Sequence, residues 1–345
     1  MKSSFRILSF TACVLCMSLA AANAQDYELS YYDDETPPAP NDMLQDAGDA
    51  YDGSCGGQCC GSCQDCGPRF GIDTFFGVNA VKNPLDDTRG NNFGLLASAS
   101  VGMKAMGNIG FQIGGSFAAY DLHGRHTSAS GRSLEVEQQT FVTAGVFKRA
   151  NLSCGDCWTW GVVWDYFTAD GFGEDGRTGP NLHQIRAQIG YAINCCNEVG
   201  FMGNTGIDNG TIFDSDNPNA RVNILDQYTA YWKRTWCNCA ETTFYAGVPS
   251  GEPSEFVFGF TGVVPLDCNF ALVGGWHYVL PSVSGGGDFP NAVLSPNYRD
   301  EIWNVYFGMS YAPGKYSRCC NPWMPLMQVA NNGTMPMVAD PNERF

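Results

Sequence analysis

The sequence predicts an all-β protein, an antiparallel up-and-down β-barrel of about twelve strands. Apolar and polar residues alternate with a period of two through most of residues 70–313, as in strands with one buried face. The connections between these segments alternate between short turns and long loops. Several segments also carry an aromatic residue near each end of one face. Together these patterns favour a meander of strands that closes on itself.

The alternation is clearest in residues 182–193, where Ile185 and Ile189 fall on one face and Gln184 and Arg186 on the other. Segments with this pattern are the expected strands. They are 70–81, 92–103, 108–121, 136–149, 157–168, 182–193, 197–207, 223–236, 240–249, 254–264, 269–281 and 301–313.

The connections between the expected strands fall into two classes, short turns and long loops. Short turns are expected at 104–108, 150–156, 194–197, 237–239 and 265–268. Long loops rich in Gly, Asn and Asp are expected at 82–91, 122–135, 169–181, 208–222 and 282–300. Only the connection at 250–253 is short where a long loop is due. An even number of strands with short turns at one end and long loops at the other is typical of a transmembrane β-barrel.

Four aromatic pairs lie eight positions apart on one face. They are Trp158 and Tyr166, Tyr228 and Trp236, Phe270 and Tyr278, and Trp303 and Tyr311. Eight residues at ~3.3 Å each span about 26 Å, or roughly 20 Å once the strand is tilted by ~40°. That length approaches the ~25 Å apolar band between the aromatic girdles of outer-membrane barrels. We therefore expect an outer-membrane type of barrel with this face toward lipid.

The opposite face combines polar residues with many glycines. Its polar residues include Asp73, Gln112, Gln139, Asp165, Arg186, Gln188, Lys233 and Asn304. Its glycines are Gly77, Gly102, Gly114, Gly145, Gly161, Gly190, Gly247, Gly259, Gly275 and Gly308. Glycine within a strand marks a bend or the close approach of another backbone. Tight curvature or a plugged lumen is therefore expected rather than an open channel.

The N-terminal residues predict export. Residues 1–24 have the basic start, apolar core and small-residue cleavage site of a signal peptide, and lipidation at Cys13 or Cys16 is the less favoured alternative. Loss of Lys2 and Arg6 moves the formal charge from -16 to -18 (-16 - 2). Residues 25–54 are expected to be an acidic disordered linker. So acidic a chain is not expected to bind nucleic acid.

The remaining expected parts are a cysteine-rich segment (55–69), the barrel (70–313) and a Pro/Met-rich C-terminal tail (314–345).

The cysteines gather at one end of the predicted barrel. Removing Cys13 and Cys16 from the sixteen leaves fourteen. They are Cys55, Cys59, Cys60, Cys63, Cys66, Cys154, Cys157, Cys195, Cys196, Cys237, Cys239, Cys268, Cys319 and Cys320. In a meander of even strand number, both chain ends and every second turn share one rim. We expect disulfides that join the N-terminal segment, turns and tail into a periplasmic cap. Zinc or another thiophilic metal is the alternative.

Signals for catalysis are sparse. His123 and His126 lie in an expected loop where a metal pair is conceivable, but no third ligand is placed. His183 and His277 are expected to be wall residues. Residues 214–220 are read as a polar loop rather than a calcium site. The chain is therefore expected to be no enzyme and to have no cofactor and no metal, with a barrel enzyme using His123 and His126 as a minor alternative.

Three stretches carry a family resemblance: CGGQCCGSCQDCG at 55–67, CGDCWTWGVVWDYFTADG at 154–171 and IGYAINCCNEVGFMG at 189–203. They resemble secreted, cysteine-rich planctomycete proteins of a domain-of-unknown-function family. The resemblance covers most of the mature chain and implies export but no known activity. The tail is a departure from ordinary outer-membrane barrels, in which a terminal aromatic within the last strand is the usual assembly signal.

The functional prediction is a structural or porin-like outer-membrane β-barrel with a disulfide-rich periplasmic cap and no catalytic activity. If it conducts, the acidic segment favours small cations. Its expected partner is outer-membrane lipid. The alternative is a soluble secreted β-protein that its cysteines cross-link into a cell wall or surface layer, with cell-wall or other surface proteins as partners. The sequence leaves the oligomeric state open.

Overall fold

The computed structural model describes part of the chain. The described residues are 70–82, 91–120, 136–152, 155–170, 179–212, 220–236, 239–250, 254–267, 269–281, 302–313 and 321–339. All of these residues belong to the unit Cys59–Phe345. The predicted signal peptide, linker and cysteine-rich segment lie outside the described residues.

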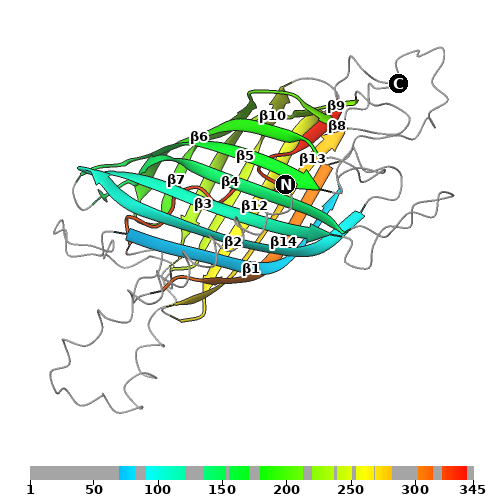
Figure 1. Cartoon of the computed structure of the whole chain (residues 1–345). Coiled ribbons are helices and arrows are strands. Elements are labelled where there is room, and N and C mark those ends of the chain that lie inside the picture. The colour runs from blue at the N-terminus through cyan, green and yellow to red at the C-terminus, as the bar shows by residue number, and fades with distance from the viewer. Residues whose placement is uncertain are drawn as a thin grey trace. The chain divides into compact units, whose positions relative to one another are not determined.

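Twelve antiparallel strands form a closed barrel (Figure 1). They are β1 (Phe70–Lys82), β2 (Asn91–Met106), β3 (Ile109–Tyr120), β4 (Glu137–Lys148), β5 (Trp158–Asp170), β6 (Asn181–Asn194), β7 (Asn197–Gly206), β10 (Asp226–Thr235), β11 (Glu241–Ser250), β12 (Ser254–Pro265), β13 (Phe270–Pro281) and β14 (Ile302–Tyr311). Each pairs with its neighbours in chain order, and β1 closes the barrel against β14 from Thr74↔Tyr311 to Lys82↔Trp303. The predicted fold class is therefore confirmed. Among the described residues, no helix has the length and apolar character needed to cross a membrane.

A second, three-stranded sheet was not predicted. It consists of β8 (Gly210–Ile212), β9 (Ala220–Ile224) and β15 (Met337–Ala339). The expected long loop at 208–222 therefore contains strand residues, and the segment expected at 223–236 is divided between β9 and β10. Strands this short have too few positions for a period of two to be recognised. The partner of β9 is also distant in the sequence, because β9 pairs with β15 near the end of the chain.

The turns define two ends of the barrel. We call the end with the β2–β3, β6–β7, β10–β11 and β12–β13 turns the short-turn rim, and the opposite end the long-loop rim. The β2–β3 turn uses Gly107 at φ 58°, a left-handed conformation that suits glycine. In the β12–β13 turn, the Asp267 carboxylate accepts the amides of Asn269 (2.7 Å) and Phe270 (2.6 Å). These hydrogen bonds hold the pKa of Asp267 below its usual value.

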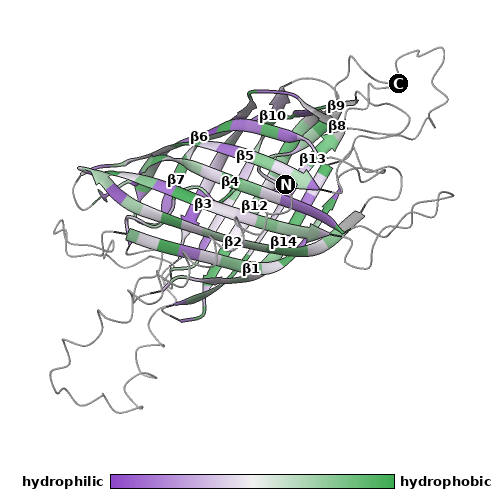
Figure 2. Cartoon of the chain, viewed as in Figure 1, coloured by the Kyte–Doolittle hydropathy of each residue, from purple (hydrophilic) through white to green (hydrophobic). Residues whose placement is uncertain are grey.

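Alternate residues face outward and inward along each strand, and hydropathy alternates with them (Figure 2). On β6, Ile185 and Ile189 are exposed, whereas Gln184 and Arg186 are buried. The faces predicted from the sequence are thus confirmed on this strand. His183 faces outward and His277 inward, so both are wall residues as predicted.

Buried hydrophobic clusters lie inside the barrel. One cluster joins Phe141, Phe167 and Leu182 of the wall to Met335 and Met337 near the C-terminus. The rings of Phe141 and Phe167 are 4.8 Å apart between centroids. A second cluster, described below, contains Val338. The barrel therefore packs its core around a segment that follows the last barrel strand.

Candidate functional site

The structure describes four of the fourteen cysteines that were predicted to form the cap. The described cysteines all lie at the short-turn rim: Cys157, Cys195, Cys196 and Cys239. Two backbone hydrogen bonds extend the strand pairing there: the Ala192 amide of β6 donates to the Cys157 carbonyl (2.9 Å), and the Thr235 amide of β10 donates to the Cys196 carbonyl (2.8 Å). Outside the described residues lie Cys55, Cys59, Cys60, Cys63, Cys66, Cys154, Cys237, Cys268, Cys319 and Cys320.

The described cysteines differ in state. Cys157 and Cys239 carry free thiols, whereas Cys195 and Cys196 are disulfide-bonded. No group of three or more His, Cys, Asp or Glu side chains could hold a metal ion within the described part of the chain. Both the disulfide cap and its metal alternative stay predictions, because most of the cysteines lie outside that part.

The histidines are dispersed. His123 and His126 lie outside the described residues. His183 stacks on Trp164 (5.4 Å between centroids) on the outer surface. His277 lies in the lumen, where its Nδ1 is 3.1 Å from the Tyr245 hydroxyl and its Nε2 is 3.3 Å from the Gln227 amide nitrogen.

The main feature of the lumen is residues 321–339, which we call the lumenal segment. It is the described part of the expected tail (314–345), and it runs inside the barrel. Cys319 and Cys320, through which the tail was expected to join the cap, lie outside the described residues. The segment starts at the short-turn rim, where the Asn321 amide donates to the Phe70 carbonyl (3.1 Å). The Arg149 guanidinium donates to the carbonyls of Met324 (3.1 and 3.2 Å) and Pro325 (2.8 Å). Its far end, β15, pairs with β9 at the long-loop rim (Figure 1).

In mid-barrel, inward side chains bind the backbone of the segment. The Gln112 amide donates to the Met327 carbonyl (2.8 Å), and its oxygen accepts the amides of Leu326 (3.0 Å) and Met327 (3.1 Å). The Ser116 hydroxyl donates to the Ala330 carbonyl (2.7 Å), and the Ala330 amide donates to Thr143 (2.9 Å). Because strands β3 and β4 use their own backbone groups within the barrel, only their side chains can satisfy the segment.

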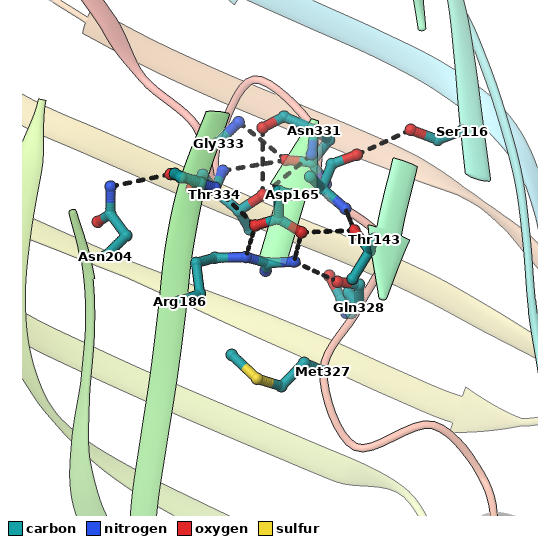
Figure 3. A network of polar contacts seen from close by, with 12 residues as sticks. Ser116, Thr143, Asp165, Arg186, Asn204, Met327, Gln328, Asn331, Gly333 and Thr334 are labelled. Carbon is teal, nitrogen blue, oxygen red and sulfur yellow. Dashed lines mark hydrogen bonds and ion pairs between the residues drawn. The ribbon is translucent and has the colours of Figure 1, made fainter. Parts of the chain in front are cut away.

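A buried ion pair of the wall binds the lumenal segment at Gln328 (Figure 3). Asp165 and Arg186 are 2.5 Å apart between Oδ2 and Nε and 3.0 Å between Oδ1 and Nη2. The carboxylate also accepts hydrogen bonds from Thr143 (2.6 Å) and Gln184 (2.8 Å). Arg186 then donates to the Gln328 carbonyl of the segment (2.8 Å). A bidentate pair of this kind fixes both side chains and points the remaining guanidinium N–H at the segment.

An asparagine turn anchors the segment before its last strand. Asn331 Oδ1 accepts the amides of Gly333 (2.8 Å) and Thr334 (3.2 Å), which closes the turn. The Asn332 amide donates to the Tyr120 hydroxyl (2.8 Å) and to Gln139 (2.7 Å). The turn is thereby attached to β3 and β4.

Inward glycines make room for the segment. A Cβ at Gly102 would lie 2.1 Å from the Trp323 carbonyl oxygen, and one at Gly114 would lie 2.6 Å from the Val329 side chain. A Cβ at Gly71 would lie 2.7 Å from the Met324 Cα. The glycines at 102 and 114 were predicted to face inward. At Gly102 the backbone that approaches is that of the lumenal segment, whereas at Gly114 the segment approaches with the Val329 side chain.

The segment lies off the barrel axis. Its hydrogen bonds to the wall come mainly from β1–β6, and Tyr306 of β14 adds one to Gln328 (2.9 Å). Among the described residues, no hydrogen bond joins the segment to β7 or to β10–β13. Between it and that wall lies a cavity of about 200 Å³, and a second of about 80 Å³ lies nearer β1, β2 and β14. Sequence reasoning had placed the polar residues on the inner face but did not identify the segment as their partner.

The first prediction concerns the buried pair. Arg186→Met leaves the Asp165 carboxylate buried without its cation, which should lower the free energy of unfolding by about 3–5 kcal/mol. The measurement is urea unfolding of the purified protein in detergent. The double variant Asp165→Leu/Arg186→Met removes both charges and should be more stable than the single variant. A single variant as stable as the double one would contradict this.

The second prediction concerns the close approach at Gly102. Gly102→Ala should displace the start of the segment and expose Trp323 and Leu326 to chymotrypsin, because the new methyl overlaps the Trp323 carbonyl. Gly262→Ala is the matched control, since nothing lies within 4 Å of a Cβ there. Mass spectrometry of the digests checks the cleavage sites. Equal protection of both variants would rule out the close contact.

We compared the chain with protein families, curated proteins and solved structures. No curated protein matches the chain. Solved structures of similar shape include the toluene transporter TodX of Pseudomonas putida (9% identity, 71% of this chain and 89% of that one, TM-score 0.38). Others are the beta domain of the Bordetella autotransporter BrkA (9%, 71% and 99%, 0.39) and the translocator domain of NalP from Neisseria meningitidis (11%, 70% and 87%, 0.37). At this identity the similarities say nothing about function.

A family model described as Family of unknown function (DUF6666) matches residues 71–337. This confirms the resemblance to a family of unknown function, while the planctomycete source and the secreted character that it implied stay predictions. The match includes β2–β14 in full and the lumenal segment as far as the first residue of β15. The chain therefore belongs to the Family of unknown function (DUF6666).

Proposed function

We propose that the protein is an outer-membrane β-barrel, structural or porin-like, that is closed by its own lumenal segment and has a disulfide-rich periplasmic cap. The observation that carries the proposal is the combination of an apolar outer wall with a polar lumen filled by the chain itself. The proposal includes no catalytic activity. Among the described residues, neither His183 nor His277 is hydrogen-bonded to a Ser, Thr or Cys side chain that could act as a nucleophile.

The outer wall has the character of a lipid-facing surface. Large apolar side chains are exposed around it, among them Phe76 (62%), Phe201 (69%) and Phe307 (56%). The charged residues among the described outward positions stand first, last or next to last in their strands: Lys82, Lys148, Asp170, Asp226 and Arg234. A soluble monomer rarely exposes so extensive an apolar surface. A bilayer would cover it.

Aromatic residues mark both edges of this apolar band. Trp158, Trp236, Phe270 and Tyr311 lie toward the short-turn rim, and Phe270 contacts Tyr311 at 5.0 Å between ring centroids. Their predicted partners Tyr166, Tyr228, Tyr278 and Trp303 lie toward the long-loop rim. Two such girdles are typical of membrane-spanning barrels, whose short turns face the periplasm. This orientation would place the described cysteines in an oxidising compartment.

The lumen limits what a porin-like function could be. The wall and the lumenal segment hold each other by many hydrogen bonds, and the cavities beside the segment are small. Conduction would therefore require the segment to move, so the resting state that we propose is closed.

The membrane location has a direct test. We expect the protein to be recovered from the membrane fraction only with detergent, because the apolar wall requires lipid or its substitute. Its folded form should also migrate differently from the boiled form on a denaturing gel. Recovery in the aqueous phase without detergent would favour the alternative, a soluble β-protein cross-linked into a wall or surface layer.

The closed lumen predicts a conductance pattern. The full-length protein should show little current in planar bilayers, whereas Gly102→Ala should show more frequent current steps because the segment is displaced. The acidic N-terminal segment should make these steps cation-selective. Gly262→Ala again serves as the control and should behave like the native chain. If none of the three proteins produces current, the porin-like function is rejected and the structural function remains.

A further inference from the structure

A cavity of about 200 Å³ lies beside the lumenal segment. It lies between Met327–Gln328 of the segment and the inward faces of β7 and β10–β13. One water molecule needs only ~10–15 Å³ of such space, so the cavity is large enough for a small organic molecule.

The charges that line the cavity are compensated within the protein. The Lys233 ammonium lies 3.1 Å from the Glu241 carboxylate. Arg186 is bound by Asp165, which lies behind it in the wall. A charged ligand would enter this buried space without an unpaired counter-ion, and burial of an unpaired charge is costly. The lining therefore favours an uncharged ligand.

Two hydroxyl groups are available to such a ligand. Thr243 of β11 and Thr261 of β12 stand opposite each other in the strand register and both line the cavity. Neither hydroxyl has a hydrogen-bond partner among the residues that the structure describes. Hydroxyls inside a barrel are expected to be hydrogen-bonded, so this pair points to a polar molecule or water in the space between them.

Aromatic rings form another part of the lining. The Tyr231 hydroxyl donates to Glu198 (2.6 Å) and accepts from Gln188 (3.1 Å). The Tyr245 hydroxyl is paired with His277. Because these hydroxyls already have partners, the two tyrosines offer mainly their rings to the cavity. Aromatic rings beside available hydroxyls suit a molecule with both an apolar face and hydroxyl groups.

The cavity is closed toward the long-loop rim. Beyond the cavity, Leu225 just before β10, Val257 of β12 and Val279 of β13 form a buried cluster with Ile302 and Val338. Val338 comes from the end of the lumenal segment. This apolar closure makes the space a chamber rather than a passage.

We infer that this chamber is a binding site for a small uncharged molecule that carries hydroxyl groups, of the size of a monosaccharide. The site uses Thr243 and Thr261 as hydrogen-bonding groups and Tyr231 and Tyr245 as ring surfaces. It follows from the lumen alone and does not rest on the membrane location or on conduction.

Binding can be measured by calorimetric titration of the full-length protein in an amine-oxide detergent, because glycoside detergents would compete. Glucose, glucuronate and glucosamine are probes of similar size that differ in charge. Glucose should bind saturably, and the two charged probes at least about tenfold more weakly. Thr243→Val and Thr261→Val should each weaken glucose binding about two- to tenfold. Thr261→Trp should abolish it by filling the chamber.

Two controls keep the result interpretable. Thr261→Ser retains the hydroxyl and should bind glucose nearly as the native protein does. Thr140→Val makes the same substitution on the outer face of β4 and should have no effect on binding. Gel mobility before and after boiling shows that each variant is folded. No saturable glucose binding, equal binding of glucuronate, or unchanged binding by the folded Thr243 and Thr261 variants would overturn the inference.

Discussion

The structure depends on one constraint, the hydrogen bonding of a peptide backbone that runs through a closed barrel. Backbone N–H and C=O groups buried without partners are costly, and the barrel strands already use their own groups in pairing with each other. The inward side chains must therefore supply the partners. Gln112 does so with both ends of its amide, and Arg186 does so after Asp165 has fixed its orientation. The buried polar residues of the wall and the course of the segment are thus two aspects of one arrangement.

Several features of the lumen follow from this arrangement. The segment must approach the wall closely to be bound by short side chains such as Ser116, and Gly102 and Gly114 permit that approach. Because the binding side chains lie mostly on β1–β6, the segment lies to one side of the lumen. The opposite wall keeps space beside it, where Thr243 and Thr261 have no partner from the segment. A plug held by one wall thus leaves a chamber along the other.

The barrel could be predicted from the sequence because its signals are local. Alternation along β6 places Ile185 outward and Arg186 inward without knowledge of any other strand. The loop lengths give the meander, and the inward glycines indicate that something approaches them closely. The course of the lumenal segment could not be predicted, because residues such as Gln112 and Met327 are far apart in the sequence and no periodicity connects them. β8, β9 and β15 were missed for the same reason. The chamber depends on where the segment lies, so it could not be foreseen either.

The most direct test is photocrosslinking of the lumenal segment in intact membranes. Photo-methionine replaces methionine with little change of shape, and Met324, Met327, Met335 and Met337 are all buried. Peptide mapping should find Met324 joined to residues near Gly71 of β1, and Met327 joined to residues near Gly161 of β5 or Gln112 of β3. Those crosslinks within one chain are the predicted result. Crosslinks of these methionines only to other proteins or to lipid would contradict a segment that lies inside the barrel.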